Sequence, residues 1–147
     1  MRLHTVQRID INRLATWLPD VAKQASCRRW TSPDVLAEPV ENLHVLTNDD
    51  ASAFVAFRNA TPEPNAAQVD FLAVEPERRR LGIGGRMALG VERRLRAKAN
   101  RLYALVPASI GLALYFWLRL GYRPLARKDS PAILSSDTSI WMVRAIS

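Results

Sequence analysis

Three consecutive arginines followed by glycines stand near the middle of the chain, in the stretch VDFLAVEPERRRLGIGGRM of residues 69–87. An apolar strand is expected to end at Val74, and a helix with an apolar residue at every fourth position is expected to begin near Gly84. Glycines let a backbone approach a ligand closely, free N–H groups at a helix N-terminus bind anions, and arginines make charge-assisted hydrogen bonds to phosphate oxygens. The stretch therefore predicts a phosphate-binding loop, and the alternative is a tight strand-to-helix turn with a solvated run of charges.

The glycine spacing separates this loop from two common phosphate loops. A Walker loop requires Gly-Lys-Ser/Thr, which the chain lacks, and the dinucleotide fingerprint requires three glycines at its own spacing early in a βαβ unit. The stretch instead resembles the acyl-CoA loop of the GNAT superfamily of N-acetyltransferases, in which Gln or Arg, two residues, Gly, one residue, and Gly or Ala follow a strand ending in Val-x-Pro. Arg79, Gly82 and Gly84 match this pattern, and Val74-Glu75-Pro76 stands where the strand should end.

A second segment, SIGLALYFWLRLGY at residues 109–122, is similar to the family's second landmark, a helix that ends in Leu-Gly-Phe before a strand. Leu120-Gly121-Tyr122 stands at that ending, and Ala113 falls where the family favours alanine. The resemblance covers nearly the whole chain and implies that acyl-CoA lies between two splayed strands, residues 68–74 and 101–106.

The resemblance also implies where acetyl-CoA, as cosubstrate, contacts the chain. The pantetheine arm is expected along the backbone of Leu72–Val74, and the pyrophosphate on Arg79–Gly85. Ile110 stands where many members carry a CoA-contacting asparagine, and the neighbouring Ser109 is expected to replace it in part. The expected cofactor-binding residues are Leu72, Ala73, Val74, Arg79, Arg80, Leu81, Gly82, Ile83, Gly84, Gly85, Arg86, Ser109 and Trp117. We expect no metal, because no cluster of metal-ligating residue types is visible in the sequence.

The group that protonates the leaving CoA thiolate is not evident. Family members often carry a tyrosine four residues before the glycine of the second landmark, and here that position is Trp117. Tyr115 lies about 200° around the helix from Trp117 and does not replace it. We therefore expect Trp117 to be a core aromatic on a buried helix face.

The general base is also open. Gln68 and Leu105 stand where two branches of the family carry a glutamate. Asp70 lies two residues after Gln68 and is expected on the same side of the sheet. Asp70 is either a base that accepts a proton from the amine, or a carboxylate that pairs with a nearby arginine or caps a neighbouring backbone. Cys27 is either a thiol whose pKa is lowered by the adjacent Arg28-Arg29, or a small buried residue.

The elements that must position these groups form a mixed α/β sheet. We expect strands at residues 3–10, 43–47, 51–58, 68–74, 101–106, 122–126 and 140–146, and helices at 11–17, within 22–39, at 84–100 and at 109–120. Asp10 is expected to cap the first helix, and Glu92 to pair with Arg96 in the third. This order predicts a mostly antiparallel, GNAT-like sheet of six to seven strands, splayed between the fourth and fifth, with helices on both faces.

Composition bounds the function. The chain has 147 residues, of which 48% are hydrophobic and 24% charged, and a formal net charge of +7. Residues 1–147 are expected to form one acyl-CoA-binding domain, cytoplasmic and without a membrane partner, because no long apolar run is present and Cys27 is the one cysteine. The positive charge favours an anionic partner, which CoA supplies. We do not expect nucleic acid, because no nucleic-acid motif is present.

The resemblance predicts an acyl-CoA-dependent N-acetyltransferase whose amine acceptor attacks the thioester directly. The alternative is a non-catalytic acyl-CoA-binding sensor or partner module, and Trp117, Ile110 and Gln68 favour it. The acceptor stays open, as does the oligomeric state, although dimers are common among proteins that resemble this one.

Overall fold

The protein is described by a computed structural model that covers residues 2–38, 40–107, 110–126, 129 and 139–146. The strands are β1 (His4–Thr5), β2 (Leu43–Thr47), β3 (Ala53–Asn59), β4 (Ala66–Val74), β5 (Arg101–Pro107), β6 (Arg123–Pro124) and β7 (Ser139–Ala145). The helices are α1 (Arg8–Leu14), α2 (Leu18–Gln24), α3 (Ile83–Leu95) and α4 (Gly111–Arg119), with 3-10 turns η1 (Arg28–Thr31), η2 (Pro33–Ala37) and η3 (Pro76–Arg78). None of the described helices is long and apolar enough to cross a bilayer.

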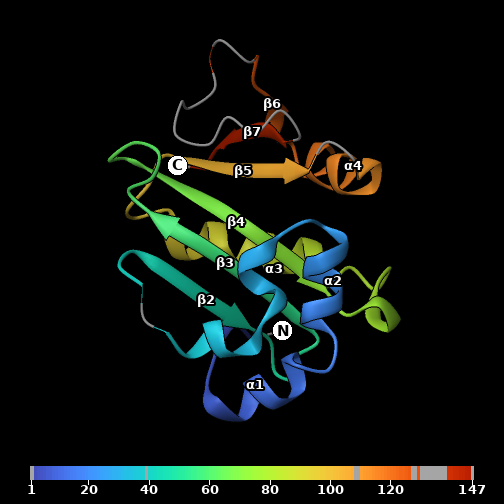
Figure 1. Ribbon diagram of the computed structural model, residues 1–147. Helices are drawn as coiled ribbons and strands as arrows, with labels where there is room; N and C mark the ends of the chain where they lie inside the picture. Colours follow the sequence, from blue (N-terminus) through green and yellow to red (C-terminus); the bar gives the residue numbers. More distant parts are fainter. Residues whose placement is uncertain (1, 39, 108–109, 127–128, 130–138, 147) are drawn as a thin grey trace.

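The strands form one sheet in the order β1-β2-β3-β4-β5-β7-β6, and β4–β5 is its parallel pair (Figure 1). Helix α3 packs behind this sheet, whereas α2 and the 3-10 turns that follow it lie in front (Figure 1). Each face has its own apolar cluster: Met87 of α3 belongs to one, and Trp17 and Trp30 belong to the other. The expected mixed, mostly antiparallel sheet with helices on both faces is confirmed.

Strands β4 and β5 run side by side only at their beginnings. The last registered pair is Val69 with Ala104, whereas β4 continues to Val74 and β5 to Pro107. The two strands therefore part over their C-terminal halves, as Figure 1 shows. This confirms the expected splay.

A β-bulge in β4 coincides with the point of separation. Ala56 of β3 pairs with Phe71, and the next residue, Phe57, pairs with Val69, so Asp70 has no partner on β3. A bulge bends its strand and increases the local twist. The bulge therefore explains why β4 turns away from β5 directly after Val69.

The N-terminal segment differs from the expectation of a strand over residues 3–10. The strand ends at Thr5, and α1 begins at Arg8 with Gln7 as its N-cap residue. Asp10 is buried in the first turn of α1, where its carboxylate accepts hydrogen bonds from the Gln7 backbone N–H (2.9 Å) and from His4 Nε2 (3.0 Å). The expected Asp10 cap is therefore wrong, because Asp10 acts from inside the helix as the acidic half of a capping box.

The expected Glu92–Arg96 pair is also wrong, because Glu92 points into the core. Its side chain is 2% exposed, and its carboxylate accepts hydrogen bonds from Tyr122 Oη (3.0 Å) and Arg144 Nη1 (3.1 Å). Arg144 also donates to the carbonyl oxygen of Leu120 at the end of α4 (3.0 Å). Burial and the Glu92 charge raise the pKa of Tyr122, so its hydroxyl remains a donor. This network joins α3, α4 and β7 behind the sheet.

We expect the Arg144→Met variant to lower the free energy of unfolding by about 3 kcal/mol, because the buried Glu92 carboxylate would lose its cationic partner. Arg93→Met, on the exposed face of α3, is the matched control and should change it by less than about 0.5 kcal/mol. Urea denaturation followed by circular dichroism measures both. Equal effects of the two substitutions would contradict the structural role of the network.

Candidate functional site

The loop between β4 and α3 presents unpaired backbone donors. Gly82 is the N-cap residue of α3 and has a left-handed backbone (φ 77°), as does Arg80 (φ 67°). A glycine N-cap has no side-chain oxygen to accept the N–H groups of Ile83, Gly84 and Gly85, the first three residues of the helix. Left-handed residues next to right-handed ones make successive N–H groups converge on an anion. The loop therefore has the backbone of an anion site.

The two glycines of the predicted motif differ in their surroundings. A Cβ atom at Gly82 would meet no heavy atom within 4 Å, so this side of the loop is open. A Cβ atom at Gly84 would approach the Phe116 ring of α4 to 3.2 Å and the Val74 side chain to 3.6 Å. Gly82 thus leaves room for a ligand, whereas Gly84 also permits the close packing of α3 against α4.

Two of the loop arginines bind the loop itself. Arg79 Nε donates to the carbonyl oxygen of Val74 (3.1 Å), and Arg86 Nη2 donates to that of Leu81 (3.0 Å). Arg80 makes no hydrogen bond or ion pair with any residue of the described chain. Arg80 is therefore the guanidinium best placed to meet an added anion.

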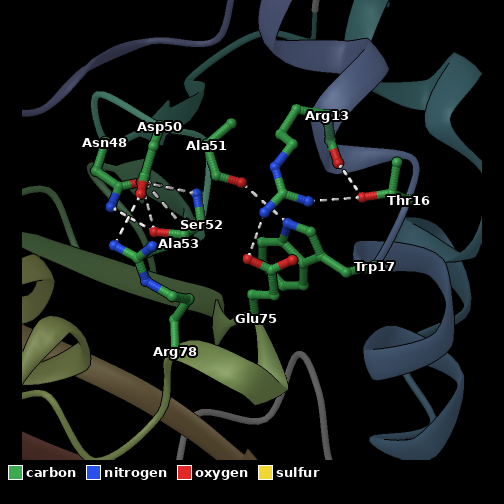
Figure 2. Close-up of polar contacts among 10 residues, drawn as sticks. All are labelled: Arg13, Thr16, Trp17, Asn48, Asp50, Ala51, Ser52, Ala53, Glu75 and Arg78. Carbon is green, nitrogen blue, oxygen red and sulfur yellow. Dashed lines mark hydrogen bonds and ion pairs between the residues drawn. The ribbon is translucent and has the colours of Figure 1, made fainter.

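The base of the loop is fastened to the turn between β2 and β3 and to α1 (Figure 2). Arg78 pairs with Asp50 (2.9 Å), and both side chains are partly exposed. Glu75, directly after β4, pairs with Arg13 of α1 (2.7 Å), and its backbone N–H donates to the Ser52 carbonyl oxygen (2.8 Å). These contacts fix the loop before any ligand arrives, which lowers the ordering cost of binding.

The end of β4 presents an open backbone edge towards β5. Leu72, Ala73 and Val74 pair with β3 along one edge. Their other edge faces the gap between the strands and has no strand partner among the described residues. An extended chain with amide groups can bind such an edge by main-chain hydrogen bonds, and the position of the pantetheine arm along this edge stays a prediction.

A polar cluster lies at the bulge, on the face covered by the N-terminal helices. Asp70 Oδ2 accepts a hydrogen bond from Arg58 Nε (2.6 Å), and Asp70 Oδ1 accepts one from Gln68 Nε2 (2.6 Å). Gln68 and Asp70 lie on the same side of the sheet, as their spacing predicts. Both oxygens of Asp70 are engaged, which supports the ion-paired alternative over a free base.

Trp117 is buried in the core behind the sheet. It is 6% exposed, and its ring packs edge-on against Phe116 (5.2 Å between centroids) and Tyr122 (4.8 Å). Tyr115 is 58% exposed on the opposite side of α4, with the Arg119 guanidinium over its ring. This packing agrees with the expected core role of Trp117. Ser109, the remaining expected contact, lies outside the described residues.

Cys27 lies near the polar cluster, at the N-terminus of η1. Burial raises the pKa of the Cys27 thiol, and the negative charge of Asp70 raises it further. The alternative in which Arg28-Arg29 lower this pKa is therefore wrong. Cys27 is a neutral thiol near neutral pH rather than an activated nucleophile.

Comparison with known proteins decides the family. Residues 12–122 match the model of the acetyltransferase (GNAT) family. The chain belongs to the GNAT family. No curated protein matches it in sequence. Among the described residues of this GNAT chain, no group of three or more His, Cys, Asp or Glu side chains is arranged to hold a metal ion.

Solved structures share the GNAT fold at low sequence identity. A GNAT acetyltransferase of Staphylococcus aureus has a TM-score of 0.76 at 15% identity, covering 99% of both chains. The N-acetyltransferase of Escherichia coli that acts on an alanine of a ribosomal protein has a TM-score of 0.68 at 21% identity, covering 99% of this chain and 94% of that one. N-acetylglutamate synthase of Neisseria gonorrhoeae, solved with coenzyme A and N-acetyl-glutamate, has a TM-score of 0.72 at 18% identity, covering 99% of this chain and 35% of that one.

Sequence reasoning missed Arg58 as part of the site. It ends the apolar segment AFVAFR of β3, where a lone arginine signals a buried or half-buried partner. Its partner was not predictable from spacing, because the bulge changes the register between β3 and β4 at that point.

We expect alkylation of Cys27 by iodoacetamide to rise with pH without reaching a plateau below about pH 9, because its raised pKa keeps the thiolate fraction below that of an ordinary cysteine. The Asp70→Asn variant should shift the profile to lower pH by removing a negative charge. Glu63→Gln, on the loop before β4, is the charge-matched control and should leave it unchanged. A plateau at or below pH 8 in the unchanged protein would contradict this placement.

Proposed function

We propose that this GNAT protein transfers the acetyl group of acetyl-CoA to an amine acceptor by direct attack on the thioester. The observation that carries the proposal is the glycine-capped N-terminus of α3 at the end of a strand whose other edge is open. An anion site and an open amide edge side by side suit the two halves of CoA, its pyrophosphate and its pantetheine arm.

Residues of the chain have separate tasks in this proposal. The N–H groups of residues 83–85 and the Arg80 guanidinium hold the pyrophosphate, while the backbone of Leu72–Val74 holds the pantetheine amides. Peptide N–H groups at the gap polarise the thioester carbonyl, which stabilises the negative charge that develops on its oxygen. Trp117 takes no part in proton transfer.

The acceptor in this proposal is a primary amine, and an α-amino group is the first class to test. The similar structure from Escherichia coli acts on an alanine, and that from Neisseria gonorrhoeae was solved with N-acetyl-glutamate. The α-amino group of a peptide has a pKa of about 7.7–8.0, against about 10.4 for the lysine side chain, so more of it is neutral near pH 7. It therefore needs less help from a base.

A non-catalytic acyl-CoA-binding module is the second candidate. It is favoured by Trp117 in the core and by the engagement of both Asp70 oxygens, because neither residue then supplies an acid or a base. CoA release measured with alanine tripeptide, glutamate and free lysine separates the candidates. Release with none of a wider amine panel, together with firm acetyl-CoA binding, would favour the module.

We expect acetyl-CoA at about 100 times its dissociation constant to stabilise the protein by about 2.7 kcal/mol, which corresponds to a rise in Tm of roughly 5–10 °C. Gly82→Val should abolish the rise, because its side chain enters the open space beside the loop and strains a left-handed backbone. Differential scanning fluorimetry measures the shift.

Two arginine variants separate a specific contact with acetyl-CoA from a non-specific effect of charge on binding. Arg80→Ala should weaken acetyl-CoA binding about tenfold by removing a charge-assisted contact. Arg93→Ala, at the other end of α3, should leave it within about twofold. The absence of any melting shift at millimolar acetyl-CoA would exclude the proposed site.

We expect Trp117→Phe to retain near-normal turnover, because the indole N–H has no chemical role and the aromatic packing against Phe116 and Tyr122 is largely kept. CoA release with the best amine of the panel measures turnover, and circular dichroism checks folding. A large loss of turnover with fold and acetyl-CoA affinity intact would show that the indole takes part in the reaction.

A further inference from the structure

A cluster of three side chains, hereafter the clamp, lies at the bulge in β4. Its members are Arg58, Asp70 and Gln68. Asp70 is the bulge residue without a partner on β3. It follows Val69, the last residue of β4 paired with β5. The clamp therefore holds the residue at which the two strands separate.

The clamp fixes Asp70 from two directions. Arg58 reaches it from β3, the neighbouring strand, and Gln68 reaches it from the same strand, two residues earlier. Gln68 is 2% exposed, and the side chains of Asp70 and Arg58 are 16% and 32% exposed. Short charge-assisted hydrogen bonds between largely covered groups are stronger and more rigid than exposed ion pairs.

We propose that Asp70 is a positioning residue: clamped by Arg58 and Gln68, it sets the angle of the bulge and thereby aims the peptide groups next to the bulge at the acyl carbonyl of the bound thioester. The inference rests on the proposed acetyl-CoA site and adds to it a set of side chains, the clamp, that fixes the direction of the backbone peptide groups. A bulge alone leaves the local backbone angle variable. A bulge whose side chain is hydrogen-bonded to two other side chains holds its peptide groups within the narrow tolerance that carbonyl polarisation requires.

The proposal predicts a difference between two ligands that share the same loop contacts. Acetyl-CoA carries the acyl carbonyl, and CoA lacks it. Misaligned peptide groups should therefore weaken acetyl-CoA binding while CoA binding is preserved. If Asp70 were instead a base that acts on the amine alone, its substitution would change neither affinity. A general loss of structure would weaken both.

The experiment measures dissociation constants of acetyl-CoA and CoA by isothermal titration calorimetry for the full chain. We expect Arg58→Met and Asp70→Ala each to weaken acetyl-CoA about tenfold, the effect of one well-aligned hydrogen bond, and to leave CoA within about twofold. The double variant should be no worse than either single variant, because both remove the same device. Arg58→Lys, which keeps a cationic donor, should recover part of the loss.

Arg101→Met is the matched control, because Arg101 makes an exposed 3.7 Å ion pair with Glu63. Arg101 is the first residue of β5, where β5 is still paired with β4. It should leave both affinities unchanged. Unaltered acetyl-CoA affinity in both clamp variants would overturn the positioning role, as would a parallel loss of both ligands. Failure of the unsubstituted protein to bind either ligand would overturn the proposed function itself, together with this inference.

Discussion

The separation of β4 from β5 is the constraint on which the other features depend. A parallel pair covered on both faces normally satisfies its backbone groups along its whole length, since unpaired buried peptide groups cost free energy. Here pairing ends at Val69 and Ala104, yet both strands continue. The exposed edge of β4 therefore needs hydrogen-bond partners from outside the sheet. The loop that follows β4 brings a second set of unpaired donors to the same end of the strand.

Most of the positive charge near the loop serves the protein rather than a ligand. Arg78 is neutralised by Asp50, and Arg13 neutralises Glu75 (Figure 2). Arg79 Nε donates a hydrogen bond to the backbone carbonyl oxygen of Val74. In the proposed binding mode, the affinity of the loop for an anion thus depends on Arg80 and on backbone donors, and it is the backbone donors that the loop contacts orient before binding. Three adjacent arginines in the sequence suggest a solvated run of charges, whereas in the structure Arg78 and Arg79 are bound to neighbouring groups of the protein.

The sequence was sufficient to predict elements with strong residue patterns, but it did not predict side-chain positions that tertiary contacts determine. The strand at residues 43–47 matches β2 in its bounds, and the glycine loop was located because its residue types are rare outside such turns. The first helix was misplaced because Asp10 caps from within rather than at the start. Glu92 was misjudged because its partner Arg144 lies on an element distant in sequence. The partner of Arg58 was missed because the bulge changes the register between β3 and β4. Spacing along the chain carries no information on such pairs.

The chemistry of thioesters explains why a protein of this family can dispense with a tyrosine at position 117. An ordinary thiol has a pKa near 8.5, so a thiolate leaves readily with little help from an acid. Attack by a neutral α-amino group likewise places a small demand on a base. What the reaction requires most is alignment of the carbonyl with polarising N–H groups, which contributes through geometry rather than proton transfer. In the proposed reaction, the packing around position 117 and the contacts that hold Asp70 at the bulge serve that alignment.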